Sequence, residues 1–272
     1  MFARLCRPLI GYRELLLALT YRDIRVKYKQ AALGISWAFF MPLMAISSGV
    51  VFRVAMALFS GQDPALRDIV GVMVKTLPWL MFARIVAGSS NSLVSNKALI
   101  TKIYFPRQVV PLSCVLSVLF DLSISMTGLL IALFVLTAGW PDLSPVVVSW
   151  WLLSVPLFLL LLFVLALGLG LLLSAANLLL RDVGYVVGVL LQFGIFFSLV
   201  FFTYEEMGSW GWPFMINPVA GILEGMRHVV LLGEIQPYLW KWLIYSTAFS
   251  LVSLVVGAVF FERAEYLFAE YA

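Results

Sequence analysis

The chain has 272 residues, of which 63% are hydrophobic and 12% are charged, and its formal net charge at pH 7 is +4. This composition excludes a soluble globular domain, because apolar windows of about 20 residues recur along the whole length. Continuously apolar windows predict helices, whereas a membrane β-barrel would alternate apolar and polar residues. We therefore expect an all-α polytopic membrane protein.

The first predicted element is a basic amphipathic helix within residues 1–32, ahead of the first apolar window. Apolar side chains and cations are interspersed there, as in helices that lie flat at a membrane surface. Its candidate contact residues are Tyr21, Arg22, Asp23, Arg25 and Lys27. The alternative is a charged flank that only stops translocation, which would not need Asp23. We treat 1–32 as an interface segment and 33–272 as one transmembrane domain.

About six apolar windows are long enough to cross a bilayer. They are 33–59, 68–91, 109–138, 147–174, 184–203 and 239–261. The segments on the side of both termini contain twelve Lys and Arg residues, and those on the other side contain three. Positive residues in short loops mark the cytoplasmic face, so both termini are predicted to be cytoplasmic. The net positive charge follows from this asymmetry and does not indicate nucleic-acid binding.

Several charged residues fall inside predicted spans, where charge is costly. Arg84 and Asp121 lie at similar distances from the cytoplasmic ends of consecutive antiparallel spans, which predicts a buried ion pair. A substrate-facing role for Arg84 stays open. We expect Lys75 to extend toward the external interface.

A short basic loop, 92–108, joins the second and third windows. Its cations place it at the cytoplasmic face, and Leu99 and Ile100 are more apolar than charge alone requires. Pro106 would end a short helix before the next span. We interpret the loop as a contact surface for a cytosolic partner; the alternative is a loop that only sets topology.

The external segment 204–238 is too long for a simple turn. Asn217 and Pro218 read as the N-cap and first residue of a helix that Gly233 ends, so 218–232 is predicted to be helical. Its charged residues, at spacings i, i+3 and i+4, share one face. These residues are Glu224, Arg227 and His228. The alternative is a solvated face of an interfacial helix, and we expect His228 to be neither a metal ligand nor a catalyst.

The sequence contains no catalytic constellation, no metal-ligand spacing and no Gly-x-x-x-x-Gly-Lys-Ser/Thr motif. We therefore expect a chain that is not an enzyme and that binds no cofactor itself. Any energy for transport has to come from a partner.

Several motifs occur in order along nearly the whole chain. They are RDIRVKYKQAALGISWAFFMPL at 22–43, PW at 78–79, NSLVSNKALITKIYFPR at 91–107, PLS at 111–113, NLLLRDVGYVV at 177–187 and NPVAGILEGMRHVVL at 217–231. Together they resemble the membrane subunit of polysaccharide-exporting ABC transporters, which include O-antigen, capsule and teichoic-acid permeases.

The resemblance implies a homodimer of six-span permeases in the bacterial inner membrane, bound to two copies of a separate ATPase that binds ATP and Mg. The implied cargo is a lipid-linked polysaccharide, with O-antigen on a polyprenyl diphosphate carrier as the first expectation. The alternatives are capsular polysaccharide, teichoic acid, or a drug or lipid moved by an exporter of the same fold.

The resemblance also implies roles for particular residues. The ATPase-coupling helix would run from 92 to 104, with a second contact after the fourth span. The coupling residues would be Asn96, Lys97, Leu99, Ile100, Lys102, Ile103, Tyr104, Arg181 and Asp182. Aromatic rings, which stack on sugar faces, would line a substrate path, although such rings also face lipid or pack in the core. The path residues would be Trp37, Phe40, Arg84, Phe193, Phe197 and Phe201, of which the last three form an i, i+4, i+8 stripe. Short re-entrant helices within 204–238 would form an external gate with Asn217, Pro218, Glu224, Arg227 and His228.

Overall fold

The computed structural model describes residues 11–29, 31–61, 63, 65–102, 105–139 and 145–268. Within these ranges all regular elements are helices, which confirms the prediction of an all-α protein. Five helical stretches are long and apolar enough to cross a membrane, and this confirms the polytopic class. They are Gly34–Phe59, Leu66–Ser95, Val109–Val135, Trp150–Leu179 and Pro237–Ala264.

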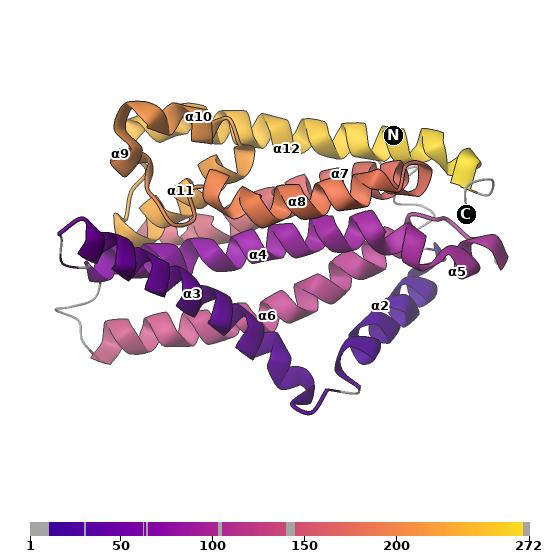
Figure 1. Cartoon of the computed structure of the whole chain (residues 1–272), viewed down its shortest axis with the longest axis horizontal. Helices are drawn as coiled ribbons and strands as arrows, with labels where there is room; N and C mark the ends of the chain where they lie inside the picture. Colours follow the sequence, from indigo (N-terminus) through magenta and orange to yellow (C-terminus); the bar gives the residue numbers. More distant parts are fainter. Residues whose placement is uncertain are drawn as a thin grey trace.

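These stretches contain five long helices of the bundle in Figure 1. They are α3 (Trp37–Phe59, after the 3-10 turn η1, Gly34–Ser36), α4 (Leu66–Ser95), α6 (Val109–Gly139), α7 (Val155–Leu179, after η3, Trp150–Ser154) and α12 (Pro237–Ala264, followed by η5, Glu265–Leu267).

The window predicted at 184–203 forms a shorter helix than expected. Helix α8 runs from Asp182 to Phe197, and its 16 residues span about 24 Å, less than the hydrocarbon thickness of about 30 Å. Leu199 adopts a positive φ of 52°, which a helix cannot contain. The backbone therefore leaves the helix before Phe201, and the predicted stripe of three Phe residues ends at Phe197.

Helix α4 is the centre of the bundle and packs against α3, α6, α7 and α8 (Figure 1). Helix α7 in turn packs along α12, and Gly168 and Gly257 meet at their crossing. A Cβ atom added at Gly257 would lie 2.1 Å from the Gly168 carbonyl oxygen, so only glycine permits this approach. Small residues allow such close helix pairs in membranes.

One end of the bundle, which we call the α5 end, carries α2 (Arg13–Tyr28), α5 (Lys97–Lys102) and the last turns of α12 (Figure 1). Helix α2 packs against α6, and the chain then reverses into α3, so that α2 and α3 form a V (Figure 1). The interface segment is thus packed against the transmembrane domain.

The opposite end, which we call the α11 end, carries four short elements (Figure 1). They are α9 (Tyr204–Met207), η4 (Gly208–Trp210), α10 (Gly211–Met215) and α11 (Pro218–Leu231). The prediction for α11 is confirmed: Asn217 Oδ1 accepts a 3.1 Å hydrogen bond from the Val219 N–H, Pro218 is the first helical residue, and Gly233 has a φ of 72°. Helix α11 is buried against α4, α7 and α12, so the alternative of a solvated helix is wrong.

Candidate functional site

At the α5 end, the predicted interface helix contacts the predicted coupling segment. The Arg22 guanidinium donates a 2.8 Å hydrogen bond to Asn96 Oδ1 and pairs with Asp23 at 2.8 Å. Ser113 Oγ donates to Asp23 at 3.2 Å. These polar contacts join α2 to the end of α4 and the start of α6. A flank that only stops translocation would need none of them.

Helix α5 is held to the bundle by Ile100, which is 4% exposed and belongs to an apolar cluster with Leu19, Leu93 and Phe105. Ile100 is therefore an internal anchor, so it is not available as the exposed contact that we expected. Lys97 and Leu99 are half-buried, and Ile103 and Tyr104 lie outside the described residues.

The exposed candidates for a partner contact lie on α2, on α5 and in the turn before α8. They are Tyr21, Arg22, Arg25, Lys27, Lys102, Arg181 and Asp182. Asn177, which fixes this turn, was not among the predicted contact residues. Its amide donates to the Ser90 carbonyl at 3.0 Å and to Asn91 Oδ1 at 3.2 Å, and it accepts from the Gly184 N–H at 2.8 Å. The sequence signal that could have pointed to Asn177 is the motif Asn-Leu-Leu-Leu-Arg-Asp, which it begins.

The predicted ion pair between Arg84 and Asp121 is wrong. Asp121 is buried and accepts instead from Lys27 Nζ and, at 2.5 Å, from the Tyr28 hydroxyl, both on α2. Burial of Tyr28, together with its hydrogen bond to Asp121 and the charge of that carboxylate, raises the pKa of the phenol. The depths of Arg84 and Asp121 along neighbouring spans predicted that they pair, but α2 supplies the partners of Asp121 instead.

The predicted aromatic path is only partly continuous. Phe193 and Phe197 are exposed on α8, and Trp37 and Phe40 lie on α3 with Phe40 also exposed. Phe201 is buried. Beside α8 runs an open apolar groove of about 560 Å³ against α4 and α7.

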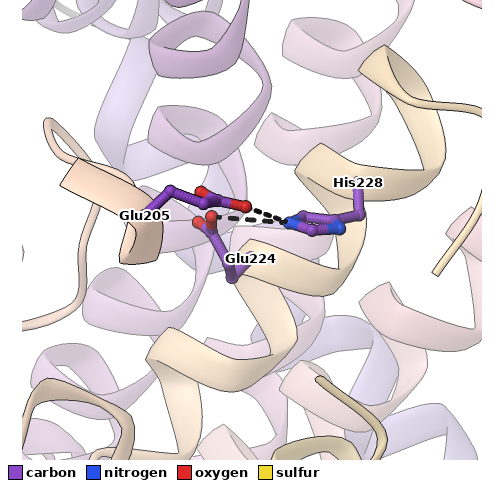
Figure 2. Close-up of side chains that lie close together, drawn as sticks. All are labelled: Glu205, Glu224 and His228. Carbon is purple, nitrogen blue, oxygen red and sulfur yellow. Dashed lines mark hydrogen bonds and ion pairs between the residues drawn. The ribbon is translucent and has the colours of Figure 1, made fainter. Parts of the chain in front are cut away.

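At the α11 end, charged and polar side chains of α9, α11 and the start of α12 meet. Figure 2 shows Glu205 of α9 facing Glu224 and His228 of α11. The Arg227 guanidinium lies among them: Nε donates to Glu224 Oε1 at 2.8 Å, and an Nη donates to Glu205 at 2.7 Å and lies 3.0 Å from His228 Nε2. The Tyr238 hydroxyl, at the start of α12, donates to Glu205 at 2.8 Å.

Lys75 also belongs to this network, contrary to the expectation that it extends to the interface. It is 1% exposed, donates to the carbonyl oxygens of Leu199 and Phe202, and pairs with Glu224 at 3.4 Å. The positive φ of Leu199 turns its carbonyl into this position at the end of α8. We call Lys75, Glu205, Glu224, Arg227, His228 and Tyr238 the α11-end network.

Partial burial by itself would raise the pKa of the Glu205 carboxyl. The hydrogen bonds from His228 and Tyr238 and the charge of Arg227 outweigh it, so the pKa of Glu205 lies well below its usual range. Glu205 is therefore ionised throughout the physiological range.

One ligand atom from each of Glu205, Glu224 and His228 lies within 4.8 Å of the others, which is a possible geometry for a metal ion. The guanidinium of Arg227, however, already lies between these groups. With Lys75 it supplies two positive charges for the two carboxylates. The arrangement is a charge-balanced hydrogen-bonded network and has no need of a metal cation.

Comparison with known proteins identifies the family to which this helical bundle belongs. Residues 14–231 match the family model described as ABC-2 type transporter. The chain belongs to the ABC-2 type transporter family. It is thus a multi-pass membrane permease of the ABC transporter class.

Curated relatives cover almost the whole permease. A protein from Myxococcus xanthus named O-antigen export system permease protein RfbA is 27% identical over 274 residues, which is 98% of each chain. A protein of the same name from Klebsiella pneumoniae is 27% identical over 264 residues, 96% of each chain. These relatives are named as transport permeases and not as enzymes.

Proposed function

We propose that this permease is the membrane channel-forming subunit of an ABC exporter that moves O-antigen, linked to a polyprenyl diphosphate carrier, across the bacterial inner membrane. The observation that carries the proposal is the end-to-end similarity to two relatives named as O-antigen export permeases. The chain lacks a Walker motif, so a separate ATPase subunit would bind ATP and Mg and drive transport.

The ATPase would dock at the α5 end. Lys102 of α5 and Arg181 and Asp182 of the following turn are exposed there, and both segments are held firmly, by Ile100 and Asn177 respectively. A rigid, exposed pair of segments is suited to transmit movement of a partner into α4 and α8. The positive-inside asymmetry supports a cytoplasmic α5 end, with both termini on that side.

Transport of a long polymer needs a path between helices, and a second copy of the chain would complete it. Exposed Phe40 on α3 and exposed Phe193 and Phe197 on α8, next to the apolar groove, are the aromatic surface that a homodimer would enclose. The functional unit would be two permeases and two ATPases.

Co-purification tests the ATPase contact. The detergent-solubilised permease, expressed with its genomic neighbours, should bring down an ATPase. The variant T101D/K102D, which changes two exposed residues of α5, should lose it, whereas K241D, exposed at the start of α12, should retain it. Absence of an ATPase from the wild-type eluate would contradict the proposal, and retention by the double variant would remove α5 as the contact.

Deletion of the gene tests the cargo. A strain that lacks the permease should lose surface O-antigen and accumulate the lipid-linked polymer inside, and the wild-type gene should restore export. Loss of capsule or teichoic acid instead, with O-antigen intact, would transfer the proposal to those polymers.

A further inference from the structure

Inside the V formed by α2 and α3 lies a cavity of about 170 Å³ (Figure 1 shows the two arms of the V). Its walls are Lys27, Tyr28, Trp37, Ala38, Met41 and Arg84. An apolar cavity of about 150 Å³ holds a benzene ring, so this space is large enough for a phosphate group. The cavity differs from the apolar groove beside α8, because its walls include two cations and the polar aromatic side chains of Tyr28 and Trp37.

The charges around this cavity are not balanced. Asp121 is satisfied by Lys27 and Tyr28 of α2. Arg84 forms no hydrogen bond or ion pair with any residue that the structure describes. The carboxylate of Asp121 is thus occupied by Lys27 and Tyr28, and the guanidinium of Arg84 remains in need of an anion. An uncompensated cation inside a membrane domain is costly and marks a functional site by default.

The position of Arg84 along α4 fits a lipid headgroup. The last turns of α4, residues 88–95, contain Ser89, Ser90, Asn91, Ser92 and Ser95, so the apolar part of the helix ends near Val86. Arg84 thus lies about one turn inside the boundary between hydrocarbon and headgroups at the α5 end. Trp37, on the opposite wall, is a residue type enriched at this boundary.

We propose that the V cavity binds the phosphate group of a membrane lipid, with Arg84 and Lys27 as its cationic contacts. The planar guanidinium fork matches phosphate oxygens in a bidentate manner, and Lys27 adds a second positive charge from the facing helix. The lipid tail lies along the exposed apolar surface of α3, where Met41 and Met44 are 53% and 65% exposed.

This inference rests on the proposed function for its biological meaning, because a carrier diphosphate at the α5 end would be the cargo's own headgroup. The same phosphate chemistry occurs in an ordinary phospholipid. Both sources are therefore included in the test, together with a diphosphate that has no tail.

The test is native mass spectrometry of the purified full-length chain, titrated separately with undecaprenyl diphosphate, phosphatidylglycerol and inorganic diphosphate. The variants are Arg84→Gln, which removes the free cation, and Met41→Trp, which fills the cavity without changing charge. Lys29→Gln is the matched control, because it removes one positive charge from an exposed position on the same segment. Gel filtration verifies that each variant is folded.

We expect undecaprenyl diphosphate to bind the wild type and to bind both cavity variants about tenfold or more weakly, because a charge-assisted contact is lost or blocked. Lys29→Gln should change the affinity by about twofold or less. The same pattern with phosphatidylglycerol alone would support the phosphate site and identify a phospholipid as its occupant.

Unchanged binding in both cavity variants, or an equal loss in Lys29→Gln, would overturn the proposal. Equal affinity for inorganic diphosphate would overturn its lipid component. No ATPase takes part in this measurement, so its failure is separate from failure of the co-purification test.

Discussion

The two ends of the bundle each contain a cluster of charged side chains, and the clusters differ in how completely their charges are compensated. In the α11-end network, Lys75 and Arg227 face Glu205 and Glu224, and each charged group has at least one partner of opposite sign. At the V cavity, Lys27 pairs with Asp121, whereas Arg84 has no partner of opposite sign among the described residues.

This difference separates a structural use of buried charge from a binding use. A closed network with equal numbers of cations and anions gains nothing from a further ion and fixes the helices that carry it. A cavity with a surplus cation, by contrast, is completed only by an anion from outside. Loss of one member should therefore destabilise the fold at the α11 end and alter binding at the α5 end.

The largest effect is expected from Glu224→Gln, because it leaves Lys75 and Arg227 buried with one fewer carboxylate. The free energy of unfolding should fall by roughly 3–5 kcal/mol. The measurement is the temperature at which the detergent-solubilised protein loses its monodisperse gel-filtration peak. Glu234→Gln, at an exposed position, is the matched control. Equal melting temperatures for the two variants would contradict the structural role of the network.

Asp121→Asn should have a smaller effect, about 1–3 kcal/mol, because Lys27 is 40% exposed and can turn to water when its partner is lost. The same melting assay applies. A double-mutant cycle with Lys27→Gln should show coupling, and a cycle with Arg84→Gln should be close to additive. Strong coupling to Arg84 would restore the ion pair that the structure rejects.

Acid should weaken the α11-end network through Glu205. Because its folded-state pKa is lower than the unfolded value of about 4.3, the ionised carboxylate stabilises the fold above that pH, and the contribution is lost as pH falls through the lower folded value. Glu205 is 44% exposed, so the contribution should be less than about 1 kcal/mol. The melting difference between wild type and Glu205→Gln should be constant at about pH 5–8 and shrink below about pH 4. A difference that grows on acidification would contradict this sign.

The smallest effect on stability is expected from Arg84→Gln in protein stripped of lipid. Removing an uncompensated cation costs no ion pair, so the melting temperature should stay the same or rise slightly. A large decrease would mean that Arg84 is part of the structural core, and the contrast between the two ends would fail.

Local signals predicted the elements that depend on neighbouring residues. The start and end of α11 were correct because Asn217, Pro218 and Gly233 act on the backbone beside them. The predicted end of α8 was wrong, because Leu199 adopts a positive φ and its carbonyl accepts from Lys75 of α4, which is distant in the chain. No pattern in 184–203 signals that tertiary contact.

Hydropathy and motif order by themselves determined the helical membrane class, the long spans and the permease family, because hydrocarbon allows few ways to satisfy backbone groups. Only the tertiary structure decided the partners of the charged side chains. The depth of Asp121 was readable from its span, but its partner depended on where α2 packs, and Lys27 and Tyr28 reached it in place of Arg84. Likewise, Ile100 and Lys75 are buried because of helices distant in the chain. Partner choice is a property of packing between elements, and a linear pattern records only the elements themselves.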